Sequence, residues 1–105
     1  MTHRIRLASA WSSTPTDAGV RHSRRFGRPT NLDPGDRVWL VCNAVPGATR
    51  AFVNGVLVAR APAGPVAIDV TELLEPRNEL TLEVASREPL GEVAVEIRAN
   101  LPADS

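Results

Sequence analysis

The chain has 105 residues, of which 43% are hydrophobic and 23% charged, the composition of one ordinary globular domain. This balance excludes a disordered chain and a collagen-like chain, and a single cysteine excludes a disulfide scaffold. Twelve arginines and twelve acidic residues give a net charge of zero, which disfavours a nucleic-acid-binding protein.

Nine prolines divide the chain into apolar segments of about 5–12 residues, a length typical of strands and short for helices. The first segment alternates with period two and is expected to form one half-buried strand. Its inward face would carry Ile5, Leu7, Ser9 and Trp11, opposite Arg4 and Arg6.

The segment 37–42 is apolar on both faces, which is typical of a central strand. Val38, Leu40 and Cys42 share one face, and Trp39 and Val41 share the other. Cys42 is predicted to be a small buried hydrophobe rather than a reactive thiol.

Asn54-Gly55 between apolar flanks is the strongest local signal, because this pair favours a two-residue type I′ turn in which both residues have positive φ. The turn fixes the register of a hairpin. The expected facing pairs are Val53 with Val56, Ala51 with Val58, and Phe52 with Leu57, the last sharing its face with Arg50.

Three further strand-like segments follow, at 66–70, 79–84 and 93–98. Residues 71–75 are expected to form one helical turn with Thr71 as its N-cap, and Pro76 prevents a longer helix. Seven or eight short strands and one helical turn predict an all-β fold, an antiparallel sandwich or barrel. The predicted core comprises Val38, Leu40, Ala51, Val53, Val56, Val58, Ile68, Leu80, Leu82, Val84, Val93, Val95 and Ile97.

Four segments, 37–41, 51–55, 68–71 and 74–84, occur in an order that resembles the N-terminal sugar-binding domain of family 2 glycoside hydrolases, the β-galactosidase and β-glucuronidase group. The resemblance implies a jelly-roll β-sandwich of the galactose-binding-like class. It also implies five structural positions, which are Asn54, Gly55, Asp69, Thr71 and Asn78. The family usually has glycine where Arg77 stands, so this turn is expected to differ.

The family's catalytic residues lie on a separate (β/α)8 barrel, for which 105 residues leave no room beside a sandwich. The resemblance therefore implies a non-catalytic carbohydrate-binding module, with a single domain over residues 1–101 and a frayed tail at 102–105. The alternative function is a structural or protein-interaction module that forms a homo-oligomer through an apolar sheet face around Trp39.

A sugar site would use an aromatic platform with polar neighbours. Trp39 is the best-placed aromatic residue, with Asn43 in register on the same strand and Arg50 on the hairpin, and these three are the predicted ligand-binding residues. Trp39 could instead pack against a second layer or a second subunit, and Trp11 is expected in the core.

The carboxylate pairs Glu79/Glu83 and Glu92/Glu96 have the spacing to face one way, as the acid pair of a glycosidase would. Regular strand alternation instead favours a solvated charged face, and neither histidine stands in a recognisable triad. We therefore predict no catalytic residue and no enzymatic activity.

Asp33, Asp36 and Asp69 are candidate ligands for a structural calcium ion, which relatives in the wider galactose-binding-like class often carry. The sequence Asp-Pro-Gly-Asp at 33–36 is typical of a turn, and Asp69 is expected to bond the backbone that follows it. We predict no metal site and no cofactor.

Charge is unevenly distributed, with nine arginines and three acidic residues in 1–60 and three arginines and nine acidic residues in 61–105. Early arginines could pair with late glutamates across strands, in particular Arg4 and Arg6 with Glu92 and Glu96. Alternatively, the basic stretch 21–28 could form a free anion-binding surface.

No stretch approaches 18 consecutive apolar residues, and the first residues lack the apolar run of a secretory signal. The sequence therefore predicts a cytoplasmic protein that does not bind membranes.

Overall fold

The computed structural model describes residues 2–99, in which nine strands and one short 3-10 helix follow one another. The elements are β1 (Thr2–Arg6), β2 (Ser12–Pro15), β3 (Val20–Gly27), β4 (Arg37–Val45), β5 (Thr49–Val53), β6 (Val56–Ala61), β7 (Gly64–Asp69), η1 (Thr71–Leu73), β8 (Arg77–Val84) and β9 (Val93–Arg98). No helix in this part of the chain is long and apolar enough to cross a membrane. The predicted tail at 102–105 lies outside the described residues.

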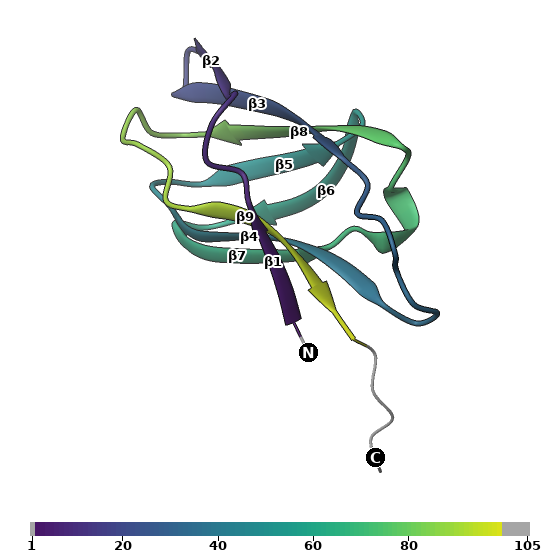
Figure 1. Ribbon diagram of the computed structural model, residues 1–105. Helices are drawn as coiled ribbons and strands as arrows, with labels where there is room; N and C mark the ends of the chain where they lie inside the picture. The colour runs from purple at the N-terminus through teal and green to yellow at the C-terminus, as the bar shows by residue number, and fades with distance from the viewer. Residues whose placement is uncertain (1, 100–105) are drawn as a thin grey trace.

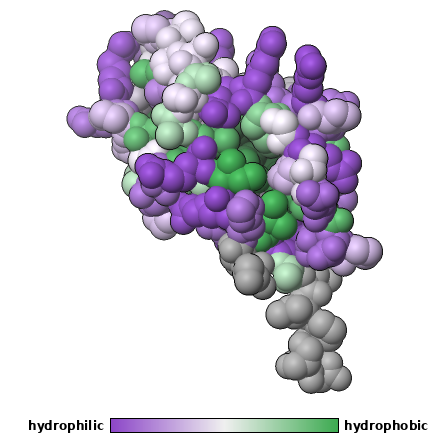
Figure 2. Space-filling model, viewed as in Figure 1, coloured by the Kyte–Doolittle hydropathy of each residue, from purple (hydrophilic) through white to green (hydrophobic). Residues whose placement is uncertain are grey.

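The strands form two antiparallel sheets that pack face to face as a β-sandwich, which confirms the predicted fold class (Figure 1). Sheet A has the strand order β1-β9-β4-β7, and sheet B has the order β2-β3-β8-β5-β6. Polar side chains cover much of the face seen in Figure 2, and hydrophobic ones show between them. Buried residues alternate with more exposed ones along the central strands, so each sheet has an inner face toward the core and an outer face toward solvent.

The core lies between the sheets and consists mainly of the inward-facing residues of β4, β5, β8 and β9. Val38 and Val53 are fully buried, and Leu80 is 1% exposed. Most of the predicted core is confirmed as buried, namely Val38, Leu40, Ala51, Val53, Leu80, Leu82, Val84, Val93 and Val95.

Four predicted core residues lie at the edges of the sandwich instead. Val56 is 51% exposed, so its prediction was wrong, because it follows the hairpin turn on the edge strand β6. Val58 on β6 and Ile68 on the edge strand β7 are half-buried and pack against the core. Ile97, near the end of β9, is also half-buried.

The β5–β6 hairpin has the predicted turn, with φ of 52° at Asn54 and 82° at Gly55. Val53 faces Val56 and Phe52 faces Leu57, as expected. The register then shifts by one residue, so Ala51 faces Ala59 rather than Val58. Val58 is the extra residue of a β-bulge, which a register counted outward from the turn cannot include.

The predicted helical turn is the 3-10 helix η1, which ends at Leu73 and takes Val70 as its N-cap. Thr71 is therefore not the N-cap. Its amide and hydroxyl both donate to Oδ1 of Asp69, at 3.0 and 2.7 Å, and its Oγ1 accepts from Val38 N at 2.8 Å. Thr71 and Asp69 thus join the end of β7 to β4.

Asn78 is 2% exposed and connects the start of β8 to three other segments. Its amide donates to the carbonyls of Phe26 and Glu75, and its Oδ1 accepts from Glu75 N and Asn54 Nδ2. Arg77 opens β8 without a positive φ, so no glycine is required there.

The first segment differs from its prediction, because the chain leaves sheet A after Arg6 and enters sheet B at Ser12. Leu7 is buried and Trp11 packs against the core, with Trp11 Nε1 donating to Leu7 O at 2.7 Å. Ile5, on the edge strand β1, is 40% exposed rather than inward. The expected strand therefore ends at Arg6, and residues 7–11 form the connection between the two sheets.

Candidate functional site

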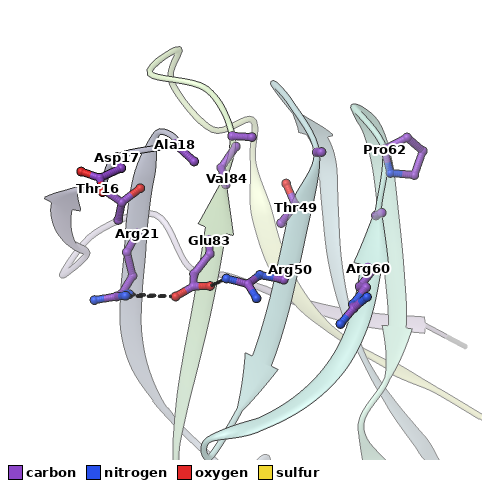
Figure 3. Close-up of a pocket in the computed structure, with 13 residues that line it drawn as sticks. Thr16, Asp17, Ala18, Arg21, Thr49, Arg50, Arg60, Pro62, Glu83 and Val84 are labelled. Carbon is purple, nitrogen blue, oxygen red and sulfur yellow. Dashed lines mark hydrogen bonds and ion pairs between the residues drawn. The ribbon is translucent and has the colours of Figure 1, made fainter.

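A pocket of about 720 Å³ opens at one end of the outer face of sheet B. Four charged side chains on four neighbouring strands form its floor, and we call it the arginine pocket (Figure 3). They are, in strand order, Arg21 on β3, Glu83 on β8, Arg50 on β5 and Arg60 on β6. Residues 16–18, between β2 and β3, line one side, and Pro62 lines the other.

Strand alternation brings these side chains to the outer face. On β5, Arg50 lies between the buried residues Thr49 and Ala51. Glu83 on β8 stands directly opposite both Arg21 and Arg50 in the strand registers. One carboxylate therefore lies between two guanidinium groups.

The Glu83 carboxylate uses one oxygen for each arginine. Arg21 Nε donates to Oε2 at 3.1 Å, and Arg50 Nη2 donates to Oε1 at 2.5 Å. The Glu83 side chain is 21% exposed, against 50% for Arg21 and 57% for Arg50. The charges that face solvent over this part of the floor are therefore the guanidinium groups.

The turn beside the pocket packs closely against sheet B. Thr16 N donates to Gly19 O at 2.9 Å, and Gly19 N donates to Thr16 Oγ1 at 3.0 Å. A Cβ at Gly19 would lie 2.0 Å from Val84 O, so only glycine allows this close approach. The packed turn carries Asp17, which brings a second carboxylate to the pocket wall.

The structure does not bring the three predicted ligand-binding residues together. Arg50 lies in the arginine pocket, whereas Trp39 and Asn43 lie on β4 in the other sheet. Trp39 alternates with the buried residues Val38 and Leu40, so its side chain lies on the outer face of sheet A. The two outer faces point away from each other, and these residues cannot form one site.

Trp39 is half-buried, and the Arg98 guanidinium stands over its ring, 4.4 Å from the centroid. A sugar that stacked on this ring face would first have to displace Arg98. Asn43 lines a smaller pocket of about 290 Å³, together with Arg4 and Glu96.

Opposite charges meet on sheet A as the pairing interpretation predicted. Arg4 lies 3.1 Å from Glu92 and 3.5 Å from Glu96, and Arg6 lies 3.1 Å from Glu92. The first and last strands are neighbours, so arginines from the beginning of the chain meet glutamates from its end. These carboxylates are engaged in ion pairs rather than arranged as a catalytic acid pair.

An ion-pair cluster centred on Arg37 joins β4, β7 and η1. Arg37 donates to Asp69 at 2.9 Å and holds both oxygens of Glu72, at 2.7 and 2.8 Å. These bonds raise the pKa of Arg37 and lower that of Glu72. Burial alone would raise the pKa of Asp69, but hydrogen bonds from Arg37 and Thr71 lower it overall.

His22 lines a pocket of about 500 Å³ with Trp11 and Leu90. Its Nδ1 lies 2.8 Å from Ser13 Oγ, and burial lowers its pKa. Cys42 is 6% exposed, and burial raises the pKa of its thiol, which confirms it as a core residue.

The aspartates considered as calcium ligands have structural roles. Asp33 N donates to Asp36 Oδ2 at 2.9 Å, and Asp36 N donates to Asp33 O at 3.0 Å, which closes the predicted turn. Within residues 2–99, no three His, Cys, Asp or Glu side chains gather as a metal site would require.

Sequence reasoning found Arg50 but missed the other members of the pocket. Arg21 and Glu83 were placed on strands, yet only the pairing of β3 with β8 makes them neighbours. Arg60 could not be placed in the pocket from the turn sequence, because a hairpin without a bulge would put it opposite Thr49, on the inner face. The bulge at Val58 places it opposite Arg50 instead.

The sequence matches no protein-family model, and no curated protein sequence matches it. Solved structures do share its fold. The β-glucuronidase described as FMN-binding from Facaelibacterium prausnitzii L2-6 superposes with a TM-score of 0.80 at 19% identity, over 95% of this chain and 23% of its own. A Bifidobacterium dentium β-glucuronidase gives a TM-score of 0.79 at 15% identity, over 92% of this chain and 30% of its own. The β-glucuronidase from Dictyoglomus thermophilum gives a TM-score of 0.76 at 13% identity, over 93% of this chain and 28% of its own.

This chain thus spans less than a third of the length of these enzymes. The TM-scores establish a common fold, whereas identities below 20% leave activity open. The protein has the fold of one β-sandwich segment of β-glucuronidases.

Proposed function

We propose that this chain is a non-catalytic carbohydrate-binding module, related to the N-terminal domains of family 2 glycoside hydrolases, whose ligand occupies the arginine pocket. The observation that carries the proposal is the pocket itself, because it combines fixed donors and acceptors in one concave surface. Guanidinium groups donate hydrogen bonds and the carboxylate of Asp17 accepts them, and sugar hydroxyls can do both.

The fold supports a carbohydrate-related role. The sandwich superposes on a segment of several β-glucuronidases, enzymes that act on sugars according to their names. Two of the matching structures are complexes, one with coumarin-3-O-glucuronide and one with D-glucuronic acid. These likenesses support a carbohydrate as the class of ligand and leave its identity to the pocket.

The non-catalytic part of the proposal follows from the carboxylates. A glycosidase needs one carboxyl group that donates a proton and a second that acts as base or nucleophile. Glu83 accepts from two arginines, and Glu92 and Glu96 are ion-paired on the opposite outer face. We expect no reducing ends to be released from any oligosaccharide by the purified chain.

Titration calorimetry against a panel of neutral and acidic oligosaccharides tests the binding function. We expect saturable binding of at least one member, and its loss in Arg50→Gln. The absence of heat from every member at millimolar concentration would contradict the proposal.

The second candidate is a protein-interaction module, and it rests on the tip of the β5–β6 hairpin. Val56 and Leu57 are 51% and 41% exposed there, on the edge strand of sheet B. Native mass spectrometry of the wild-type chain and of Leu57→Asp tests it. A dimer that the substitution dissociates would support this function, and a monomer at high concentration would exclude self-association.

A further inference from the structure

Two arginines face each other directly in the arginine pocket, where a cross-strand pair would normally avoid like charges. Arg50 on β5 and Arg60 on β6 are register partners on the outer face of sheet B. Like charges directly opposite each other destabilise a strand pair. The arrangement therefore works against the stability of the hairpin, and an anion bound by both guanidinium groups would offset that cost.

Glu83 does not supply that anion. Its two oxygens are already taken by Arg21 and Arg50, and the close-up shows no bond from it to Arg60 (Figure 3). Across residues 2–99, the Arg60 side chain makes no ion pair or hydrogen bond. The floor of three arginines and one glutamate carries two excess positive charges, and with Asp17 on the wall the pocket as a whole carries one.

Sheet A contains a like-charge pair that shows the contrast. Arg37 and Arg98 are also register partners, on β4 and β9. Arg37 is held by Asp69 and Glu72, and Arg98 by Glu96 and by the ring of Trp39. The pair in sheet A is fully compensated within the chain, whereas Arg60 in sheet B is not.

A specific irregularity of the backbone creates the uncompensated pair. Without the β-bulge at Val58, Arg60 would lie opposite Thr49 and point toward the core, where Thr49 is 5% exposed. Bulges are known to redirect side chains next to functional sites. The bulge here turns Arg60 into the pocket, beside Arg50.

We propose that Arg50 and Arg60 together hold the carboxylate of an acidic sugar, so that the module selects uronic acids over neutral saccharides. This inference rests on the carbohydrate-binding function proposed above. Guanidinium groups match a carboxylate in shape and form charge-assisted hydrogen bonds with it. The carboxylate of Asp17 then accepts hydrogen bonds from the sugar hydroxyls.

The composition of the pocket favours an acidic sugar over a nucleic acid. Its lining contains no aromatic residue, so neither a base nor a sugar ring could stack there and recognition would rest on charge and hydrogen bonds. The Asp17 carboxylate would repel a chain of phosphates and can accept from sugar hydroxyls. A single carboxylate on a hydroxyl-rich ring fits both the excess positive charge and the acceptors beside it.

Calorimetry with trigalacturonate and with its fully methyl-esterified form tests the inference, since the two ligands differ only in the charge and the methyl groups of the carboxyls. We expect the ester to bind the wild-type chain about tenfold more weakly or worse. Arg60→Gln should weaken trigalacturonate binding by a similar factor and leave the midpoint of thermal unfolding unchanged or higher. The matched control is Arg25→Gln, which removes the same charge from the same outer face outside the pocket, and it should change binding less than about twofold.

Each other outcome overturns a definite part of the account. Equal binding of acid and ester would refute carboxylate recognition and leave carbohydrate binding standing. Binding of neither would refute both. An equal loss in Arg25→Gln and Arg60→Gln would show that net charge attracts the ligand and that the pocket does not. A single-stranded oligonucleotide that bound more tightly than trigalacturonate would assign the pocket to nucleic acid.

Discussion

At the scale of single residues, a few buried polar side chains hold the loops of this sandwich in place. Asn78 occupies all four of its hydrogen bonds with Phe26, Glu75 and Asn54, and Asp69 connects Thr71 to Arg37. Turn chemistry predicted that Asp69 bonds the backbone that follows it, and its bond from Thr71 N confirms this. Asn78 was marked only through a family resemblance, because its partners include Phe26, 52 residues away, which local pattern could not name.

Replacing Asn78 with alanine should cost about 2–4 kcal/mol of the free energy of unfolding, because buried backbone groups of Phe26 and Glu75 lose their partner. Urea denaturation measures this loss. Asn43→Ala is the control, since Asn43 is exposed, and it should change stability by less than about 0.5 kcal/mol. Equal effects at the two sites would contradict the role assigned to Asn78.

The Asp69 carboxylate should make the free energy of unfolding depend on pH in the acidic range. Its pKa is lower in the folded chain than in the unfolded one, so its contribution is complete above the unfolded value of about 4 and disappears as the pH falls through the folded value. Asp69→Asn keeps an acceptor for Thr71 and loses the ion pair with Arg37. The variant should be about 1 kcal/mol less stable at pH 7, and the difference should vanish below pH 4.

Chemical denaturation of both proteins between pH 2 and pH 8 checks this prediction. Glu88→Gln, at an exposed position, provides a matched loss of charge and should show no such pH-dependent difference. A stability difference for Asp69→Asn that stayed constant down to pH 2 would show that Asp69 does not stabilise the fold through its negative charge.

At the scale of elements, the β5–β6 hairpin shows which part of a strand pair the sequence determines. Asn54 and Gly55 specify the turn, because both adopt positive φ, and they fix the nearest two pairs. The bulge at Val58 lies beyond these two pairs, so the turn sequence does not specify it. Alternation likewise predicted a strand at 5–11, but the strand ends at Arg6 and residues 7–11 cross to the other sheet, which local pattern does not show.

Gly55→Val should destabilise the chain by about 1–3 kcal/mol through backbone strain alone, because a Cβ at Gly55 meets nothing within 4 Å and its φ is 82°. Gly27→Val is the matched control. A Cβ at Gly27 meets only one backbone oxygen at 4.0 Å, and its φ is not positive. Thermal unfolding should therefore show a large loss for the first variant and a small one for the second, and the reverse order would refute the type I′ turn.

At the scale of the whole molecule, period-two alternation was enough to predict the sandwich and most of its core. The functional face was harder to predict, because it depends on which strands become neighbours. Arg21 and Glu83 are 62 residues apart in the chain and meet only through the pairing of β3 with β8. Arginines from the beginning of the chain pair with glutamates from its end over sheet A, whereas Arg60, unpaired within residues 2–99, adds a positive charge to the floor of the arginine pocket.

The central claim is that one end of the outer face of sheet B is the ligand site, and NMR shift mapping tests it most directly. The backbone amides and arginine side chains of the labelled chain are followed while trigalacturonate is added. We expect saturable shifts at Arg21, Arg50, Arg60 and residues 16–18, and none around Trp39 on the opposite face. Shifts centred on Trp39, or no shifts at millimolar trisaccharide, would contradict the account.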